Sequence, residues 1–331
     1  MMFKSVLSSE ISDFLDMRLH TVAKTTYEYD VFILTTFDKH LIKKNYRKKI
    51  LDENVVNSLI QSFAGNSKTV MNKVAIIRNF VKYLNTSGNQ SFIPRSPKVK
   101  SEYIPYVYSK KELEQIFYYA DNLPIRSYSS CNPYLPVMIP MILRILYGCG
   151  TRLEETMSLQ RKDIDFTTNT IFLKNAKFSK ERLIPIHETL SAILKKYCKF
   201  LEITDNANAY LFPSTILQDK HFSTHEVLAW FDVILKTANI AQDNCGHKQR
   251  GANLHSFRHV FVLNSMLQLE SLGHPVDMND LLLPTYLGHK CLIDTDQYMR
   301  FSGLSTSEFE KVFDDFTKDI IPKLEVHYIE E

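Results

Sequence analysis

The chain has 331 residues, 44% hydrophobic and 23% charged, with a formal net charge of +3; at roughly 100–200 residues per domain, this length predicts two domains. Glycine is scarce, with 9 residues in 331 against a usual share of about 7%, and no glycine-rich phosphate-binding motif occurs, which argues against dinucleotide-binding and P-loop enzymes. The 5 cysteines are scattered and form no Cys-x-x-Cys pair, which predicts reduced, buried thiols rather than a disulfide framework or a zinc ribbon.

The first 100 residues are basic, with 16 Lys or Arg against 8 Asp or Glu, a net charge of +8. The N-terminus lacks the uninterrupted apolar run of a signal peptide. Apolar residues then recur with helical spacing in three segments, which predicts a module of short amphipathic helices. These segments are residues 27–41, with Thr25 and Thr26 able to cap the start, residues 55–63 after the potential cap Asp52, and residues 70–84, which stop at residues 85–88.

A cluster of positive charge lies between the first two of these segments. Residues 43–49 hold five cations around Tyr46. Such a run is typical of a solvated turn, and within a basic helical module it also suits contacts to phosphate groups. The sequence leaves both interpretations open.

A proline-containing linker follows the helical module. Pro94, Pro97 and Pro105 account for three of the 12 prolines of the chain, and helical periodicity is lost around them, which predicts an extended, stiff segment. Ser109 and Glu112 then form a capping box that opens a new helix. We therefore expect a helical domain at residues 1–90 and a linker at residues 91–108.

The longest apolar stretch of the chain comes soon after the linker. Residues 135–146 contain two prolines and Arg144, so the stretch is too short and too interrupted to span a bilayer. It predicts a buried helix over residues 137–147. With no membrane segment and no signal peptide, we expect a soluble, cytoplasmic protein that does not bind a membrane.

The helical pattern has one β-rich interruption. The runs 170–174 and 182–186 are rich in β-forming residues and are joined by residues 175–181, which predicts a hairpin. Pro185 cannot donate to a ladder, so it places the second run at a sheet edge. A helix is predicted to follow over residues 189–200.

The end of the chain is acidic. Residues 308–331 hold 3 basic and 8 acidic side chains, a net charge of −5. Apolar residues recur there with helical spacing, which predicts an amphipathic helix. They are Phe309, Val312, Phe313, Phe316 and Ile320.

Between the linker and this acidic tail, unusual polar side chains gather in a few short segments, each ordinary by itself. Arg152 can pair with Glu155 one helical turn later, and Lys177 in a hairpin turn is typical of a solvated lysine. His255 and His259 have the spacing of a zinc-binding pair, but no third ligand is evident and no glutamate general base lies between them.

The combination is more specific than its parts. In chain order, the segments read Gly-x-Arg with a glutamate three residues after the arginine, Lys-x-x-Lys-x-Arg in the hairpin, His-x-x-Arg-His, and Leu-Gly-His followed by a tyrosine. They resemble the active site of the tyrosine recombinase, or phage integrase, family, and the resemblance covers essentially the whole chain. The six matching positions are Arg152, Lys177, His255, Arg258, His289 and Tyr298.

The resemblance implies a fold and a domain layout. The expected fold is mainly α with a small β-hairpin sheet, arranged as a two-domain, C-shaped clamp on duplex DNA. The helical domain would bind the core DNA site, residues 109–306 would form the catalytic domain, and residues 307–331 a C-terminal helical tail. No separate arm-binding domain is expected. The tail would dock either on a neighbouring protomer, as in the family, or on its own domain.

The resemblance also implies the chemistry. Two guanidiniums offer fixed forks of donors for the non-bridging oxygens of a phosphodiester, a role that falls to Arg152 and Arg258. Tyr298 would attack the phosphorus to give a 3′-phosphotyrosyl intermediate, with His255 as proton acceptor or orienting partner. His289 would donate a hydrogen bond to a non-bridging oxygen, and Lys177 would protonate the leaving 5′-oxygen. The ester conserves the bond energy, so no ATP, metal or other cofactor is expected.

Departures from the family pattern leave some assignments open. Ala176 and Phe178 flank Lys177, whereas a glycine is often found beside the catalytic lysine of the family, so Lys174 remains a rival to Lys177. Phe257 replaces a common leucine, and Glu155 and His259 are expected to support the site rather than to act in it.

The expected function is site-specific DNA recombination on double-stranded DNA. The chain would be a monomer in solution and a homo-tetramer on two synapsed sites. Two rival functions are a type IB topoisomerase-like nicking and closing enzyme, and a catalytically silent DNA-binding regulator on the same scaffold.

Overall fold

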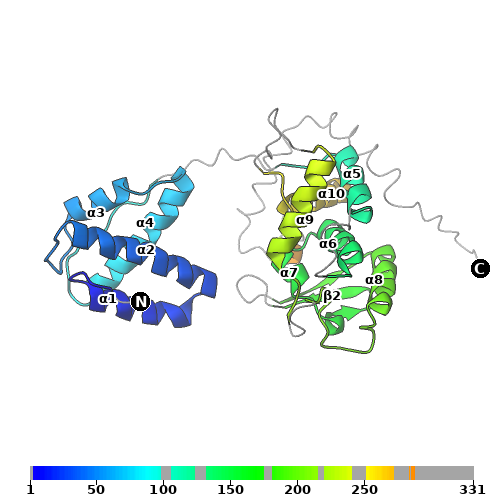
Figure 1. The fold of residues 1–331 in the computed structure, drawn as a ribbon, viewed down its shortest axis with the longest axis horizontal. Coiled ribbons are helices and arrows are strands. Elements are labelled where there is room, and N and C mark those ends of the chain that lie inside the picture. Colours follow the sequence, from blue (N-terminus) through cyan, green and yellow to red (C-terminus); the bar gives the residue numbers. More distant parts are fainter. Residues whose placement is uncertain are drawn as a thin grey trace, which may run out of the picture. The chain divides into compact units, whose positions relative to one another are not determined.

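The computed structural model describes residues 3–97, 106–123, 132–174, 181–214, 220–240, 251–271, 283 and 285–287. The chain divides into two compact units, Met1–Tyr103 and Ile104–Glu331, and each has its own hydrophobic core. Figure 1 shows a helical first unit, and a second unit in which helices surround a small sheet.

In the described part of the first unit, residues 3–97, four helices pack around one core. They are α1 (Ser8–Thr21), α2 (Lys24–Lys43), α3 (Glu53–Gln61) and α4 (Ser67–Thr86). The side chains of Phe14, Phe37 and Phe80 meet edge to face in the core, with centroids 5.5 and 5.7 Å apart. This packing buries the apolar face of each amphipathic helix.

Two predictions for this unit are confirmed and one is wrong. The carboxylate of Asp52 caps α3 by accepting the N–H of Val55 at 2.9 Å, and α4 ends at Thr86. However, the N-cap of α2 is Ala23 rather than Thr25 or Thr26, which lie inside the first turn. The sequence pattern also did not single out α1, since its exposed apolar residues obscure the buried stripe; they are Met17 and Leu19.

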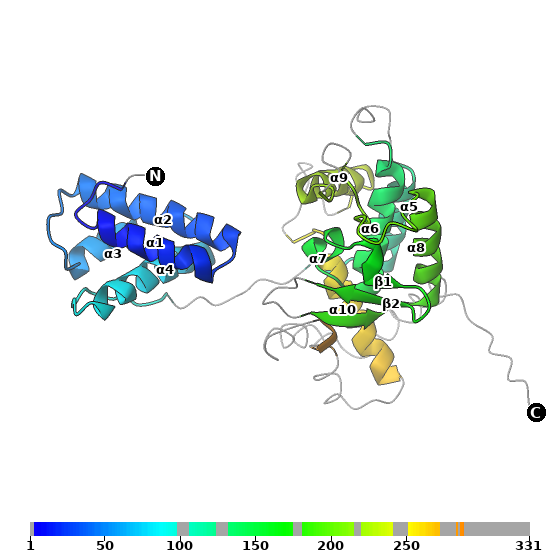
Figure 2. The ribbon, with the colours of Figure 1, turned by 90° about the horizontal axis from the view of Figure 1, so that it is seen from below.

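The second unit is built around α6 (Leu135–Cys149), which carries ten buried residues. Helices α5 (Lys110–Asp121), α8 (Glu188–Phe200) and α10 (His255–Ser271) all pack on it, as Figures 1 and 2 show. A helix that is apolar on every side is stable in water only when others cover it. The position of α6 is therefore fixed by its packing against α5, α8 and α10.

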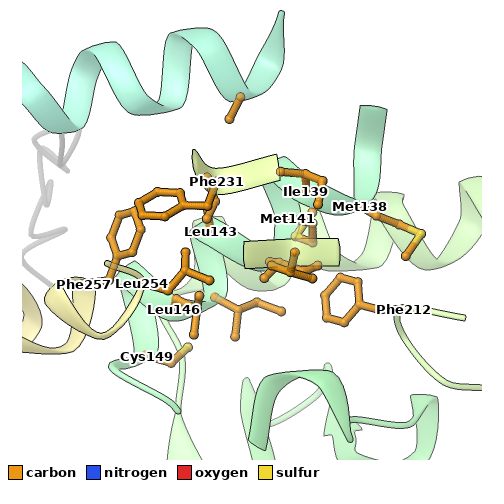
Figure 3. Packing of buried hydrophobic residues seen from close by; sticks show 14 of the residues in the cluster. Met138, Ile139, Met141, Leu143, Leu146, Cys149, Phe212, Phe231, Leu254 and Phe257 are labelled. Atoms are coloured by element: carbon orange, nitrogen blue, oxygen red, sulfur yellow. The ribbon is translucent and has the colours of Figure 1, made fainter. Parts of the chain in front are cut away.

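Aromatic packing joins the start of this unit to α10. Tyr108 is buried and contacts Phe231 of α9 (Thr224–Thr237) and Phe257 of α10, with centroids 6.3 and 5.6 Å apart. Figure 3 shows Phe231 and Phe257 beside Leu143 and Leu146 of α6. The first turn of α10 is consequently fixed relative to the end of α6.

The predicted hairpin is confirmed. Strands β2 (Thr170–Leu173) and β3 (Arg182–Pro185) pair antiparallel, and a short strand β1 (Ile164–Asp165), which was not predicted, extends the sheet in the order β1-β2-β3. Pro185 lies in an edge strand, as expected. The capping box of Ser109 and Glu112 at the start of α5 is present as well. The mainly α fold with a small sheet is confirmed.

Two further properties concern the described residues alone. None of their helices is long and apolar enough to cross a membrane. Cys149 and Cys198 are buried and free, as predicted for reduced thiols, and the other three cysteines lie outside the described residues.

Candidate active site

The site begins where α6 ends. Gly150 caps this helix in the left-handed conformation, with φ of 56°, a region that residues with a Cβ rarely adopt. A Cβ added there would lie 2.4 Å from the ring of Phe261 on α10. The glycine of the Gly-x-Arg motif thus allows α6 to turn tightly against α10 and to bring the next residues to that helix.

Arg152 lies directly after this turn and is the N-cap of the short helix α7 (Leu153–Met157). Its Nη1 donates to Oε1 of Glu155 at 2.7 Å, and its backbone N–H donates to Oε2 at 3.0 Å. Glu155 is buried, whereas the side chain of Arg152 is 26% exposed. The carboxylate therefore holds the guanidinium from behind and leaves part of it open to a ligand.

The pKa of Glu155 reflects two opposing effects. Burial alone raises it, but hydrogen bonds from the Arg182 guanidinium and from the N–H and guanidinium of Arg152, together with the charge of Arg182, lower the pKa below its ordinary value. Glu155 is therefore a carboxylate at neutral pH, shared between two guanidiniums.

Arg258 comes from the first turn of α10 and is only 1% exposed. Its Nη1 donates to the carbonyl oxygen of Gly150 at 2.8 Å, and its Nη2 donates to that of Leu287 at 2.7 Å. These bonds join the end of α6, the start of α10 and residues 285–287. The guanidinium is thus fixed in orientation at the base of the site.

His255 lies one turn before Arg258, where α10 begins. Its backbone N–H donates to the side-chain oxygen of Asn253 at 2.8 Å, which fixes the first residue of the helix. Desolvation, followed by the positive charges of Arg258 and Arg152, lowers the pKa of His255. A histidine neutral at pH 7 can accept a proton. The hydrogen bond from Arg258 to the carbonyl oxygen of Gly150 brings this turn of α10 to the segment that carries Arg152.

His259 packs its ring against that of His255. Its ring meets that of His255 edge to face, with centroids 4.9 Å apart. Burial, then the charges of His255 and Arg258, lowers the pKa of His259 to about 3. The two histidines are thus neutral neighbours, and within the described part of the chain no group of His, Cys, Asp or Glu is arranged to hold a metal ion.

Arg182 is the member of this site whose role the sequence did not reveal. It is the first residue of β3 and binds both oxygens of Glu155, at 3.2 and 2.9 Å. The alternation of the strand could have indicated this position. Side chains two residues apart lie on the same face of a strand, so Arg182 shares a face with the buried Ile184. An inward-facing cation requires an acidic partner.

The rival lysine has a structural partner. The ammonium of Lys174 donates to Asp163, a buried carboxylate that also accepts the backbone N–H of Gln160 at 2.9 Å. Lys174 is therefore part of the contact between β2 and the 3₁₀ turn η2 (Arg161–Asp163).

The structure brings together three of the six predicted site residues, Arg152, His255 and Arg258. The other three, Lys177, His289 and Tyr298, lie outside the described residues. The described group offers one partly open guanidinium, one buried guanidinium and a neutral imidazole. Such a group can bind a phosphate diester and accept a proton beside it.

Comparison with known proteins gives consistent matches. The family model described as "Phage integrase family" matches residues 107–301. Tyrosine recombinase XerC of Chlorobaculum parvum is 23% identical over 312 residues, covering 88% of this chain and 87% of that protein.

Solved structures show the same fold. The XerH site-specific recombinase, bound to palindromic difH substrate in a post-cleavage complex, has a TM-score of 0.66 at 16% identity, covering 92% of this chain and 84% of that one. A lambda integrase tetramer bound to a Holliday junction has a TM-score of 0.59 at 14% identity, covering 86% and 77%. The chain therefore has the two-domain fold of these recombinases.

Proposed function

Since the chain belongs to the phage integrase family, the tyrosine-type site-specific DNA recombinases, we propose that it cleaves and rejoins DNA through a 3′-phosphotyrosyl intermediate on Tyr298. The observation that supports this proposal best is the convergence of Arg152, His255 and Arg258. They come from two segments about one hundred residues apart, joined by the hydrogen bond between Arg258 and Gly150. Arg152 is bound to the buried carboxylate of Glu155 and Arg258 to the carbonyl oxygen of Gly150. Unrelated surface cations would not be held by such neighbouring buried partners.

In the proposed cleavage step, the phenolic oxygen of Tyr298 attacks the scissile phosphorus as the bond to the 5′-oxygen breaks. His255 takes the phenolic proton, which its neutral state permits. Lys177 gives a proton to the leaving 5′-oxygen. Rejoining reverses each transfer, so protons and bonds balance over the cycle without ATP.

The two arginines would stabilise the transition state. Negative charge accumulates there on the non-bridging oxygens, and preorganised donors are worth several kcal/mol of stabilisation. Arg152 reaches these oxygens from its open side while Glu155 holds the other. Arg258 adds a fixed positive charge beneath them, and His289 is proposed as a further hydrogen-bond donor.

Between the two lysines, we assign the general acid to Lys177. Lys174 is held by the buried carboxylate of Asp163, and a lysine in that contact would have to break it in order to reach DNA. This choice follows the family resemblance at Lys177 and the structural role found for Lys174.

The proposal extends to DNA binding and assembly. Residues 1–90 would bind duplex DNA, with the linker at 91–108 and catalysis in residues 109–306. The cations at 43, 44, 47, 48 and 49 are exposed, as phosphate contacts require. Four protomers would synapse two sites, as in the lambda integrase tetramer on a Holliday junction, with the tail at 307–331 contacting a neighbour.

A covalent-trapping experiment tests the proposal. The protein selects its site from a random pool of duplexes, and that site is then offered with a nick beside the scissile phosphate so that the cleaved fragment diffuses away. We expect a protein–DNA adduct on a denaturing gel with the natural chain and none with Tyr298→Phe. Joined products from two sites support recombination, whereas relaxation of supercoils alone supports the topoisomerase-like alternative, and site binding without any adduct supports the silent regulator.

A further inference from the structure

We propose that Arg182 is a positioning residue, which holds Arg152 and Arg258 in place without touching DNA itself. This inference rests on the proposed function. It is carried by the contacts of one buried guanidinium with two separate segments of the second unit, the helix α7 and residues 285–287.

The first contact is with the residue that supports Arg152. The Nη1 and Nη2 atoms of Arg182 donate to Oε1 and Oε2 of Glu155 at 3.2 and 2.9 Å. The same two oxygens bind the guanidinium and the backbone N–H of Arg152 at 2.7 and 3.0 Å. Arg182 therefore fixes the plane of the carboxylate, and the carboxylate fixes Arg152.

The second contact is with the segment that supports Arg258. The Nε of Arg182 donates to the carbonyl oxygen of Tyr286 at 2.7 Å. The next carbonyl, that of Leu287, accepts from Nη2 of Arg258 at 2.7 Å. Two guanidiniums thus bind consecutive peptide carbonyls, and a shift of one displaces the acceptor of the other.

The place of Arg182 in the fold suits this role. Its side chain is 10% exposed, so it lies behind the group rather than on the DNA-facing surface. It opens β3, directly beyond the hairpin turn that holds Lys177 in the sequence. The network therefore ties the base of that turn to both arginines.

Only arginine can make this set of contacts. A guanidinium presents donors in a rigid planar fork, so it can bind a carboxylate with two groups and a carbonyl with the third. A lysine at this position keeps the charge but offers a single nitrogen. A positive charge without the three guanidinium donors would therefore fix neither the plane of the Glu155 carboxylate nor the carbonyl group of Tyr286.

The test compares R182Q and R182K in the full chain with the natural protein. Three quantities are measured for each: affinity for the selected site, the single-turnover cleavage rate on the nicked site, and hydrogen exchange at the Arg152 amide. We expect affinity within twofold, cleavage at least tenfold slower in both variants, and faster exchange at Arg152.

The matched control is R144Q. Arg144 makes a similar two-bond contact with Asp121, at 2.9 and 2.8 Å, on a part of the unit that the catalytic group does not use. This variant should cleave within twofold of the natural chain. The control therefore distinguishes the effect of losing any two-bond ion pair from the effect of losing the pair between Arg182 and Glu155.

Unchanged cleavage in both variants, or a loss that weaker DNA binding explains, overturns the inference. If R182Q does not fold, R182K provides the same comparison. If the natural chain forms no adduct, the proposed function fails, and the exchange measurement still decides whether Arg182 positions Arg152: exchange equal to that of the natural chain refutes it.

Discussion

The guanidinium of Arg258 donates a 2.8 Å hydrogen bond to the carbonyl oxygen of Gly150, 108 residues earlier in the chain. This contact joins the end of α6 to the first turn of α10, and so brings the Gly-x-Arg segment to the His-x-x-Arg-His segment. The carbonyl can point at Arg258 because Gly150 adopts a left-handed conformation.

We predict that Gly150→Ala destabilises the protein and slows cleavage. The substitution costs about 1–2 kcal/mol for the left-handed backbone, and about 1–3 kcal/mol more for the clash with Phe261. Thermal or urea unfolding measures the loss. The control is Gly88→Ala, where φ is 83° but no atom lies within 4 Å of the new Cβ. An equal loss in the two variants would contradict the proposed close packing at Gly150.

Glu155→Gln should be more damaging than its small change in shape suggests. The substitution leaves two guanidiniums beside a neutral amide, and breaking a buried ion pair typically costs about 3–5 kcal/mol. Asp121→Asn is the control, because the partner pair with Arg144 is partly exposed and exposed pairs contribute about 0–1 kcal/mol. Urea unfolding and the cleavage rate should both separate the variants, and equal stability would refute a structural role for Glu155.

Acid should destabilise the second unit through His259 before its carboxylates protonate. The folded pKa of His259 is about 3, below the ordinary 6.5, so the unfolded chain binds the proton first and stability falls as the pH drops from about 6.5 towards 3. Between pH 7.5 and pH 5 this amounts to about 2 kcal/mol. His259→Gln should reduce the slope of the unfolding free energy against pH over that interval and leave the part due to His255, whose pKa is also lowered. An unchanged slope would contradict the burial argument.

Glu155 adds to the loss of stability at lower pH. Its folded pKa is depressed, so its stabilisation is present above its unfolded pKa and disappears as the pH falls through the folded value. Acid unfolding of the second unit should therefore continue below pH 4.5 even in the His259→Gln variant.

The sequence could predict contacts that depend on local spacing. The Asp52 cap, the capping box at Ser109 and the 170–186 hairpin all follow from residue types a few positions apart. The threonine signal did not mark the start of α2, because this helix begins at Lys24 after Ala23, with no side-chain cap. The contacts of Arg182 could not be predicted either, since they join β3 to residues 27 and 104 positions away.

The general acid can be assigned by changing the leaving group. Lys177→Ala should slow cleavage by about a hundredfold or more, and a substrate with sulfur in place of the 5′-bridging oxygen should restore the rate, because a thiolate leaves without a proton. Lys174→Ala should cleave within a few-fold of the natural chain, since its ammonium is bound to Asp163. Sulfur rescue of Lys174→Ala, but not of Lys177→Ala, would reverse the assignment.

The proposed cleavage chemistry is tested most directly by identifying the residue that carries DNA in the trapped adduct. The natural chain is trapped on the nicked site, digested with protease and nuclease, and the nucleotide-bearing peptide is sequenced by mass spectrometry. We expect a nucleotide joined through its 3′-phosphate to Tyr298, with the same adduct lost in Arg152→Ala. A 5′-phosphate linkage, or attachment to any residue other than Tyr298, would contradict the proposed chemistry.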